Sequence, residues 1–194
     1  MNDLTTNDWL ILVNAQHPLS PDFIPGDLIP APFSGKEWMN AAAAEQLQRL
    51  IHAIFGEREI VVTSAYRSYE EQQRLYRHSL KSHGEHYTKL YVAEPGRSEH
   101  QTGLAVDLGF ADYANDVICP TFEGRAVSLH FMERMAEFGF ILRYPKGKTA
   151  VTGIAHEPWH FRYVGCPHSQ LIQQQRWTLE EYHRFINRGR EAND

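Results

Sequence analysis

Two short stretches of the chain carry histidine and carboxylate side chains at spacings that suit a metal ion. His100 and Asp107 occupy the first stretch, and Glu157 and His160 occupy the second. His100, Asp107 and His160 would supply three protein ligands and leave a fourth position for water, which is the pattern of a catalytic zinc site. Glu157 stands three residues before His160, close enough to reach such a water as a general base. The two stretches together predict one catalytic metal site.

Each member of this set also has an ordinary structural interpretation. Asp107 could end a strand in a turn, His100 could be a loop histidine, and His160 could be a hydrogen-bonded histidine of the core. The combination favours the metal site, because the base and the third ligand occur together in the second stretch. His156 is adjacent to Glu157, and neighbours on an extended chain face opposite ways, so we interpret His156 as lying outside the ligand set.

The bulk composition limits the classes of protein that fit. The chain has 194 residues, 42% of them hydrophobic, which suits one domain with a core of its own. A net charge of -5 and a pI near 6.1 give no sign of binding to nucleic acid or to an anionic membrane. Asp3, Asp8 and a short apolar run at the start do not fit a secretory signal. We expect a cytoplasmic protein with a small-molecule substrate, and free thiols at Cys119 and Cys166.

The elements before the site include a surface segment, a helix and a strand. Prolines crowd residues 17–35, which forbids a regular helix and predicts an extended segment on the surface. From about Trp38, apolar residues recur at intervals of three and four, which predicts a core helix that ends near Gly56. Residues 59–64 are mostly β-branched and predict a strand.

A second helix follows that strand and supplies polar side chains. Ser68 and Glu71 form a capping box, which predicts a helix running to about residue 80. Arg67 is then fixed at the junction of strand and helix, and Gln72 on the first turns can face the same space. Residues 81–97 are expected to form a long loop, whose His83 and His86 we interpret as solvated.

The remaining pattern predicts three strands, a helix between two of them and a helical end. The strands are expected at residues 105–110, 140–144 and 160–164, with Asp107 and His160 able to meet across neighbouring strands. Residues 128–138 predict a helix with Leu129, Met132 and either Met135 or Ala136 directed inward. Helices gathered on one side of a few strands indicate an α+β fold with a small, mostly antiparallel sheet.

Three blocks of sequence resemble one known family. Ser98 to Asp107 reads Ser-x-His-x-x-Gly-x-Ala-x-Asp, Glu157 to His160 reads Glu-x-Trp-His, and Ser64 to Gln72 also fits. Together they resemble the zinc D-Ala-D-Ala metallopeptidases, the VanY- and VanX-like enzymes whose LAS-type fold is shared with hedgehog signalling domains. The short chain without a leader is most similar to the VanXY-type bifunctional D,D-dipeptidase/D,D-carboxypeptidases of vancomycin resistance.

The resemblance implies one Zn²⁺, a D,D-peptidase activity and a role for each matched residue. The substrates would be D-Ala-D-Ala and the UDP-linked muramyl pentapeptide precursor of peptidoglycan. The chain would be a single zinc D,D-peptidase domain, 1–194, with an N-terminal wrap at 1–37, a catalytic core at 60–165 and a C-terminal helical segment at 167–194. The implied roles are zinc ligation by His100, Asp107 and His160, base catalysis by Glu157, transition-state stabilisation by Arg67, and substrate contacts by Ser98 and Gln72.

Two other functions remain open at this point. A phage or cell-wall peptidase of the same fold would act on polymeric peptidoglycan, but it would be helped by a wall-binding module or a basic face, and neither is visible. A zinc-stabilised binding module, as in the hedgehog domains, would keep the ligands without the chemistry. Glu157 and Arg67 are both present, which disfavours that module.

Overall fold

A four-stranded antiparallel sheet forms the centre of the molecule. The computed structural model describes residues 9–191, with side chains described through residue 189. The strands are β3 (Ile60–Ser64), β4 (Ala105–Phe110), β5 (Phe140–Leu142) and β6 (His160–Tyr163), and their order in the sheet is β3-β4-β6-β5. All three neighbouring pairs are antiparallel. The four predicted strands and the predicted α+β class are therefore confirmed.

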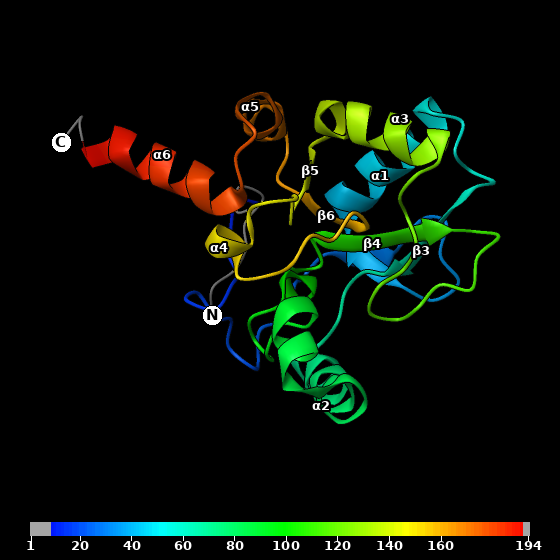
Figure 1. Ribbon diagram of the computed structural model, residues 1–194. Helices are drawn as coiled ribbons and strands as arrows, with labels where there is room; N and C mark the ends of the chain where they lie inside the picture. The colour runs from blue at the N-terminus through cyan, green and yellow to red at the C-terminus, as the bar shows by residue number, and fades with distance from the viewer. Residues whose placement is uncertain (1–8, 192–194) are drawn as a thin grey trace.

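One face of the sheet is apolar and is covered by two helices. Val106 lies opposite Phe161, and Val62 lies opposite Leu108, so alternation along the strands brings these side chains to a common face. They pack against α1 (Ala41–Ala53) and α3 (Ala126–Arg134), which lie on one side of the sheet in Figure 1. This burial supplies the main hydrophobic core and fixes which side chains must face the other way.

The opposite face carries the polar side chains of the predicted site. Asp107 and His160 alternate with the core residues of β4 and β6, and they lie directly opposite one another. The helix α2 (Tyr69–Tyr91) lies on this side, below the sheet in Figure 1, and its Gln72 lines the same pocket as Asp107 and His160. The expectation that the helices gather on one side was therefore wrong for α2.

The proline-rich segment contributes one short strand. Because this strand pairs with residues 38–40, the first helix begins later in the chain than predicted. β1 (Leu28–Pro30) pairs with β2 (Trp38–Asn40) in a separate two-stranded sheet. The helix predicted from about Trp38 therefore begins at Ala41, where the side chain of Asn40 caps it by accepting from the Ala43 amide at 3.1 Å.

The second helix is longer than its sequence pattern predicts. The capping box forms as expected: the Ser68 hydroxyl accepts from the Glu71 amide, and the Glu71 carboxylate accepts from the Ser68 amide. The chain then remains helical to Tyr91, with a break at Gly84 where φ is 81°. Beyond the break, the Thr88 hydroxyl donates to the Gly84 carbonyl at 2.9 Å, one turn back in the resumed helix. The predicted loop was therefore wrong for residues 81–91.

The third helix confirms its predicted position, and the predicted inward direction is confirmed for Met132, Met135 and Ala136 but not for Leu129. Its buried residues are Val127, Ser128 and Phe131, whereas Leu129 is 56% exposed. A 3₁₀ turn, Met135–Phe138, continues the apolar stripe with Met135, and Gly139 ends it in the left-handed conformation. The inward direction predicted for Leu129 was wrong, because the stripe runs through Val127, Phe131 and Met135 at intervals of four.

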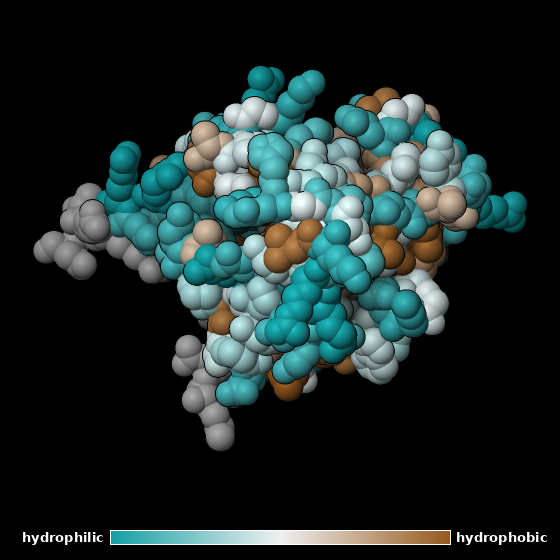
Figure 2. All heavy atoms as spheres, turned by 60° about the horizontal axis from the view of Figure 1, so that its bottom comes forward, coloured by the Kyte–Doolittle hydropathy of each residue, from teal (hydrophilic) through white to brown (hydrophobic). Residues whose placement is uncertain are grey.

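Three further helices complete the described fold. They are α4 (Thr149–Thr152), α5 (His168–Gln175) and α6 (Leu179–Glu191). Leu179 and Tyr182 of α6 join Ile141 and Val164 in a second hydrophobic cluster. The face that bears α2 is predominantly hydrophilic, with small separate apolar patches (Figure 2). Among the described residues, no helix is both long and apolar enough to cross a membrane.

Candidate active site

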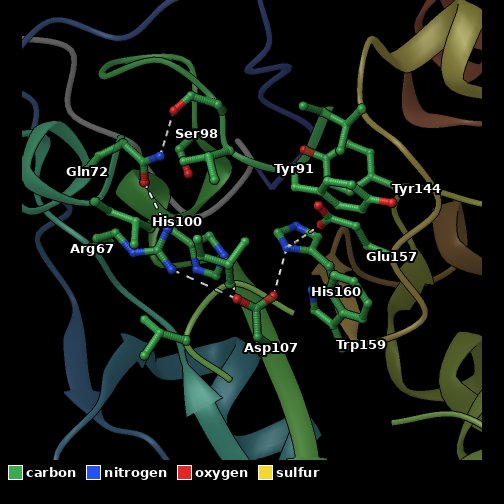
Figure 3. Close-up of a pocket in the computed structure, with 16 residues that line it drawn as sticks. Arg67, Gln72, Tyr91, Ser98, His100, Asp107, Tyr144, Glu157, Trp159 and His160 are labelled. Carbon is green, nitrogen blue, oxygen red and sulfur yellow. Dashed lines mark hydrogen bonds and ion pairs between the residues drawn. The ribbon is translucent and has the colours of Figure 1, made fainter. Parts of the chain in front are cut away.

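One 3₁₀ turn and two strands bring the predicted metal ligands together. His100 lies on a 3₁₀ turn, Glu99–Thr102, while Asp107 and His160 lie on β4 and β6 in direct register. Nε2 of His100 is 3.1 Å from Oδ2 of Asp107, and Nδ1 of His160 is 2.9 Å from Oδ1 of Asp107 (Figure 3). The candidate ligand atoms of all three residues lie within 4.8 Å of one another.

The turn that carries His100 depends on the glycine that ends it. Gly103 adopts a φ of 71°, which few other residues accept, and its carbonyl accepts from the Asn40 amide at 2.9 Å. A Cβ atom at this position would approach Leu28 to 2.8 Å. The motif glycine therefore allows the close packing that presents His100 to β4.

The protonation of His100 shows that a cation suits the space between the three side chains. Its Nδ1 is 2.6 Å from the carbonyl oxygen of Ala65, which only accepts, so Nδ1 carries the hydrogen. Burial lowers the pKa of His100, which favours the neutral ring with a lone pair on Nε2. That lone pair faces the carboxylate of Asp107, another acceptor. A metal ion satisfies both acceptors at once.

The second histidine has a different electrostatic environment. Burial disfavours the imidazolium form of His160, but the Asp107 carboxylate outweighs burial and raises the pKa of His160 to about 9. In turn, burial disfavours the carboxylate of Asp107, yet the two imidazoles lower its pKa. A cation at this position replaces the proton of His160, as is usual when metals bind protein side chains.

Glu157 lies beside the ligands without joining them. Its Oε2 is 3.8 Å from Nδ1 of His160, and its backbone amide donates to the Tyr144 carbonyl at 3.1 Å. Burial raises the pKa of Glu157 to about 8, with the negative charge of Asp107 adding to the rise and His160 opposing it. A carboxyl group with this pKa can both accept and return a proton near neutral pH.

Arg67 points into the same space from the junction of β3 and α2 (Figure 3). Its Nη1 donates to Oε1 of Gln72 at 2.9 Å, and its Nη2 donates to the Ser64 hydroxyl at 2.7 Å. Nη2 also lies 3.9 Å from Oδ2 of Asp107. Its hydrogen-bond partners are both neutral, so the guanidinium keeps a positive charge that is directed at the pocket.

Gln72 and Ser98, the two residues predicted to contact a substrate, differ in the hydrogen bonds that their side chains already make. Gln72 is buried, its oxygen accepts from Arg67, and its amide nitrogen donates to the Ala93 carbonyl at 2.7 Å. Gln72 therefore orients Arg67 and the wall of the pocket. Ser98 also lines the pocket, and its hydroxyl forms no cap hydrogen bond with the turn that follows.

The other histidines lie outside the ligand set. His156 places Nδ1 3.0 Å from the Tyr144 carbonyl oxygen, and its Nε2 is 4.0 Å from Glu123. His83 and His86 are exposed on α2 rather than on a loop. Within the described residues, both cysteines are free, as expected.

Several residues of the site have no signal in the motif analysis. Most of the apolar wall comes from segments that fold against the motifs, and these contribute Tyr91, Val92, Val117, Ile118, Tyr144 and Ile154, whereas Trp159 belongs to the Glu-x-Trp-His block. Beneath the ligands lies a second set of charged residues that the sequence analysis also missed. Its signal was available, because Arg143 and Arg162 are charged residues in or next to otherwise apolar strands.

Comparisons with known proteins agree with this geometry. The VanY family model, described as D-alanyl-D-alanine carboxypeptidase, matches residues 36–166. The chain is 49% identical over 179 residues to the bifunctional D-Ala-D-Ala dipeptidase and D-Ala-D-Ala carboxypeptidase VanXYC of Enterococcus gallinarum, which covers 91% of this chain and 94% of that relative.

Two solved structures share the fold. The D,D-dipeptidase VanXYg, in complex with a D-Ala-D-Ala phosphinate analogue, gives a TM-score of 0.86 at 43% identity, over 92% of this chain and 71% of that one. A Zn(II) complex of a mutant D,D-pentapeptidase VanY, from a VanB-type resistance cassette, gives 0.76 at 34% identity, over 90% and 98% of the two chains.

Proposed function

Because the chain belongs to the VanY D-alanyl-D-alanine carboxypeptidase family, we propose that it hydrolyses the amide bond between two D-alanine residues. The substrates are the free dipeptide D-Ala-D-Ala and the C-terminus of the UDP-linked muramyl pentapeptide. The observation that carries this proposal is the buried His100–Asp107–His160 cluster, flanked by an acidic and a basic side chain. Loss of the terminal D-alanine removes the group that vancomycin recognises, which is the basis of resistance.

The ligands suit Zn²⁺, with two imidazoles and one carboxylate. When bound, Zn²⁺ supplies Lewis-acid chemistry, which polarises a carbonyl group and makes a water molecule acidic enough to react near neutral pH. Glu157 accepts the proton of the attacking water as the new C–O bond forms. It then gives that proton to the leaving amine as the C–N bond breaks, so that Glu157 is again a carboxylate at the end of the reaction.

Arg67 stabilises the negative charge that develops on the carbonyl oxygen. A guanidinium is always charged and presents several donors in a plane, which suits an oxyanion. Ser64 and Gln72 fix its orientation before the substrate arrives, so little reorganisation is needed during the reaction. Ser98, at the edge of the pocket, is available to hydrogen-bond the peptide substrate.

A second cavity continues the pocket and supports the use of longer substrates. It has a volume of about 140 Å³ and shares Val92, Ala93, Tyr144 and Ile154 with the active site. From there it extends towards Lys89 and Arg97 of neighbouring segments. The amino-terminal part of a pentapeptide can lie in this cavity, whereas the dipeptide occupies the active site alone.

The test is a comparison of D-alanine release from three substrates by the zinc-loaded protein. We expect turnover of D-Ala-D-Ala and of the UDP-linked muramyl pentapeptide, and none of L-Ala-L-Ala, which is the matched control. Purified cell walls serve as a third substrate. Release of fragments from walls without turnover of the two soluble substrates would contradict the proposal in favour of a wall peptidase.

A further inference from the structure

A balanced cluster of four charges lies under the metal site, on the same face of the sheet as His160. Glu99, Arg143 and Arg162 are at most 1% exposed, and Glu180 is 7% exposed. Nε of Arg143 donates to Oε1 of Glu99 at 2.7 Å, and its two terminal nitrogens bind the Glu180 carboxylate at 2.9 and 2.6 Å. Nη1 of Arg162 is 2.8 Å from the same Oε1 of Glu99.

Both arginines contact one oxygen of Glu99 and leave the other unused. Within the described residues, Oε2 of Glu99 is a buried atom with no hydrogen-bond partner, and so is Nε2 of His160. These two atoms lie 3.8 Å apart. An unpaired buried polar atom costs free energy, and here an acceptor and a potential donor face each other.

The roles of the two ring nitrogens of His160 are linked. Nδ1 lies at 2.9 Å from Asp107 in the ligand cluster, so Nδ1 is the nitrogen that must offer a lone pair to a cation. A neutral imidazole carries one hydrogen, which then resides on Nε2. That hydrogen is directed towards Oε2 of Glu99.

We propose that Glu99 is a positioning residue: it accepts the Nε2 hydrogen of His160 and thereby fixes the tautomer and ring orientation with which Nδ1 binds the metal. Arg143 and Arg162 hold the Glu99 carboxylate in place through its other oxygen. The inference rests on the metal site of the proposed function, but it concerns metal binding and not turnover. Partners of this kind are common behind metal-binding histidines, and their loss typically weakens metal affinity by about 10–100-fold.

A purely structural ion pair would not explain this arrangement. Such a pair would share the arginine contacts between both carboxylate oxygens, as Glu180 does with Arg143. Glu99 instead directs one oxygen at a metal ligand. Glu180 therefore provides a matched control, because it contributes the same charge to the same arginine but does not face His160.

The experiment compares the zinc affinity of Glu99→Gln and Glu180→Gln by competition with a chromophoric chelator. The amide keeps the shape of the side chain and removes the negative charge. We expect zinc to bind about 10–100-fold more weakly to Glu99→Gln, and within about threefold of the parent protein to Glu180→Gln. Equal losses in both variants, or unchanged affinity in Glu99→Gln, would overturn the proposal.

A measurement on the unsubstituted protein covers the case in which Glu99→Gln does not fold. ¹⁵N NMR of the histidine rings in the zinc-loaded protein, with His160 assigned by the loss of its signals in His160→Gln, reports which nitrogen carries the hydrogen. We expect a hydrogen on Nε2 and zinc on Nδ1. Zinc on Nε2 refutes the inference. Inactivity towards D-alanine substrates would refute the proposed function and leave this result intact.

Discussion

Arg67 and Arg143 are both arginines of the site region, but they differ in burial and in their partners. Arg67 donates to two neutral groups, Ser64 and Gln72, and its side chain is 15% exposed towards the pocket. Arg143 is fully buried, and Glu99 and Glu180 neutralise its charge. Arg67 can therefore bind a substrate, because its charge is directed at the pocket. Arg143 can only hold other side chains, because both of its partners are buried carboxylates.

Glu157→Ala tests the base. We expect the variant to keep its zinc, because Glu157 is outside the ligand cluster, and to lose about 10²- to 10⁴-fold in kcat on D-Ala-D-Ala. Metal analysis and steady-state kinetics measure the two effects. Glu123→Ala, an exposed carboxylate near His156, is the control and should keep both zinc and activity. Undiminished turnover in Glu157→Ala would rule out the assigned base.

Arg67→Ala tests the oxyanion partner. Removing one preorganised donor typically lowers turnover by about 100-fold or more, so we expect a fall of this size in kcat on D-Ala-D-Ala. Arg74→Ala, which removes an exposed arginine of α2, should have no comparable effect. A large rise in KM with unchanged kcat would instead assign Arg67 to ground-state binding.

The local elements could be predicted where one chemical signal determines them. The strands at 60–64 and 105–110 follow from their β-branched and apolar residues, and the start of α2 follows from Ser68 and Glu71. The end of α2 could not be predicted. Gly84 is typical of a helix end, and no capping pattern in the sequence indicates that the chain resumes the helix and continues to Tyr91.

Ser68→Ala tests how much the capping box stabilises the start of α2. We expect a loss of about 1 kcal/mol in the free energy of unfolding, because the Glu71 amide loses the Ser68 hydroxyl as its acceptor. Guanidinium unfolding measures it. Ser82→Ala, at an exposed position inside the same helix, is the control and should change stability by less than about 0.5 kcal/mol. Equal effects at both positions would show that the cap is unimportant.

The face of α3 provides a second test at this scale. Phe131 is fully buried against Phe122 and Phe161, so Phe131→Ala should cost about 3–5 kcal/mol. Leu129→Ala should cost less than about 0.5 kcal/mol, since this side chain is 56% exposed. Chemical denaturation of both variants decides whether Phe131 faces the core, as in the structure, or Leu129 does, as the sequence pattern predicted. Comparable losses would mean that the helix is rotated.

At the scale of the whole molecule, all seven predicted site residues line one pocket, but the charged residues that support them were not predicted. Their motifs are short and contain the chemistry itself, so His100, Asp107 and Glu157 could be predicted from spacing alone. The supporting contacts join residues far apart in the chain: Arg143 binds Glu180, and the Asn14 amide also donates to Glu180. No local pattern encodes such partners, because they depend on how the second hydrophobic cluster packs.

The pair of Arg143 and Glu180 predicts a pH effect on stability. Burial tends to raise the pKa of Glu180, but Arg143 outweighs burial and holds the pKa below its ordinary value of 4.5. A lowered folded-state pKa means that the carboxylate stabilises the fold above pH 4.5, and that this contribution is lost as the pH falls below it. We expect Glu180→Gln to unfold more easily at pH 7, by about 3 kcal/mol, and to show a shallower loss between pH 5 and 3.

Urea unfolding at several pH values measures this effect. Glu133→Gln, which changes an exposed carboxylate of α3, is the control and should follow the parent protein over the whole range. A Glu180→Gln variant with the same pH slope as the parent would place the acid sensitivity elsewhere in the molecule.

Arg162 donates to the carbonyl oxygens of Trp9 and Ile11, at 2.9 and 2.8 Å, while α6 provides Glu180 to Arg143. Both ends of the described chain therefore hold the arginines behind Glu99. During synthesis on a ribosome, all three metal ligands are made before Glu180. Glu180 is therefore the last member of the charged cluster to be made, and Arg143 gains its second carboxylate only when α6 packs against the rest of the fold.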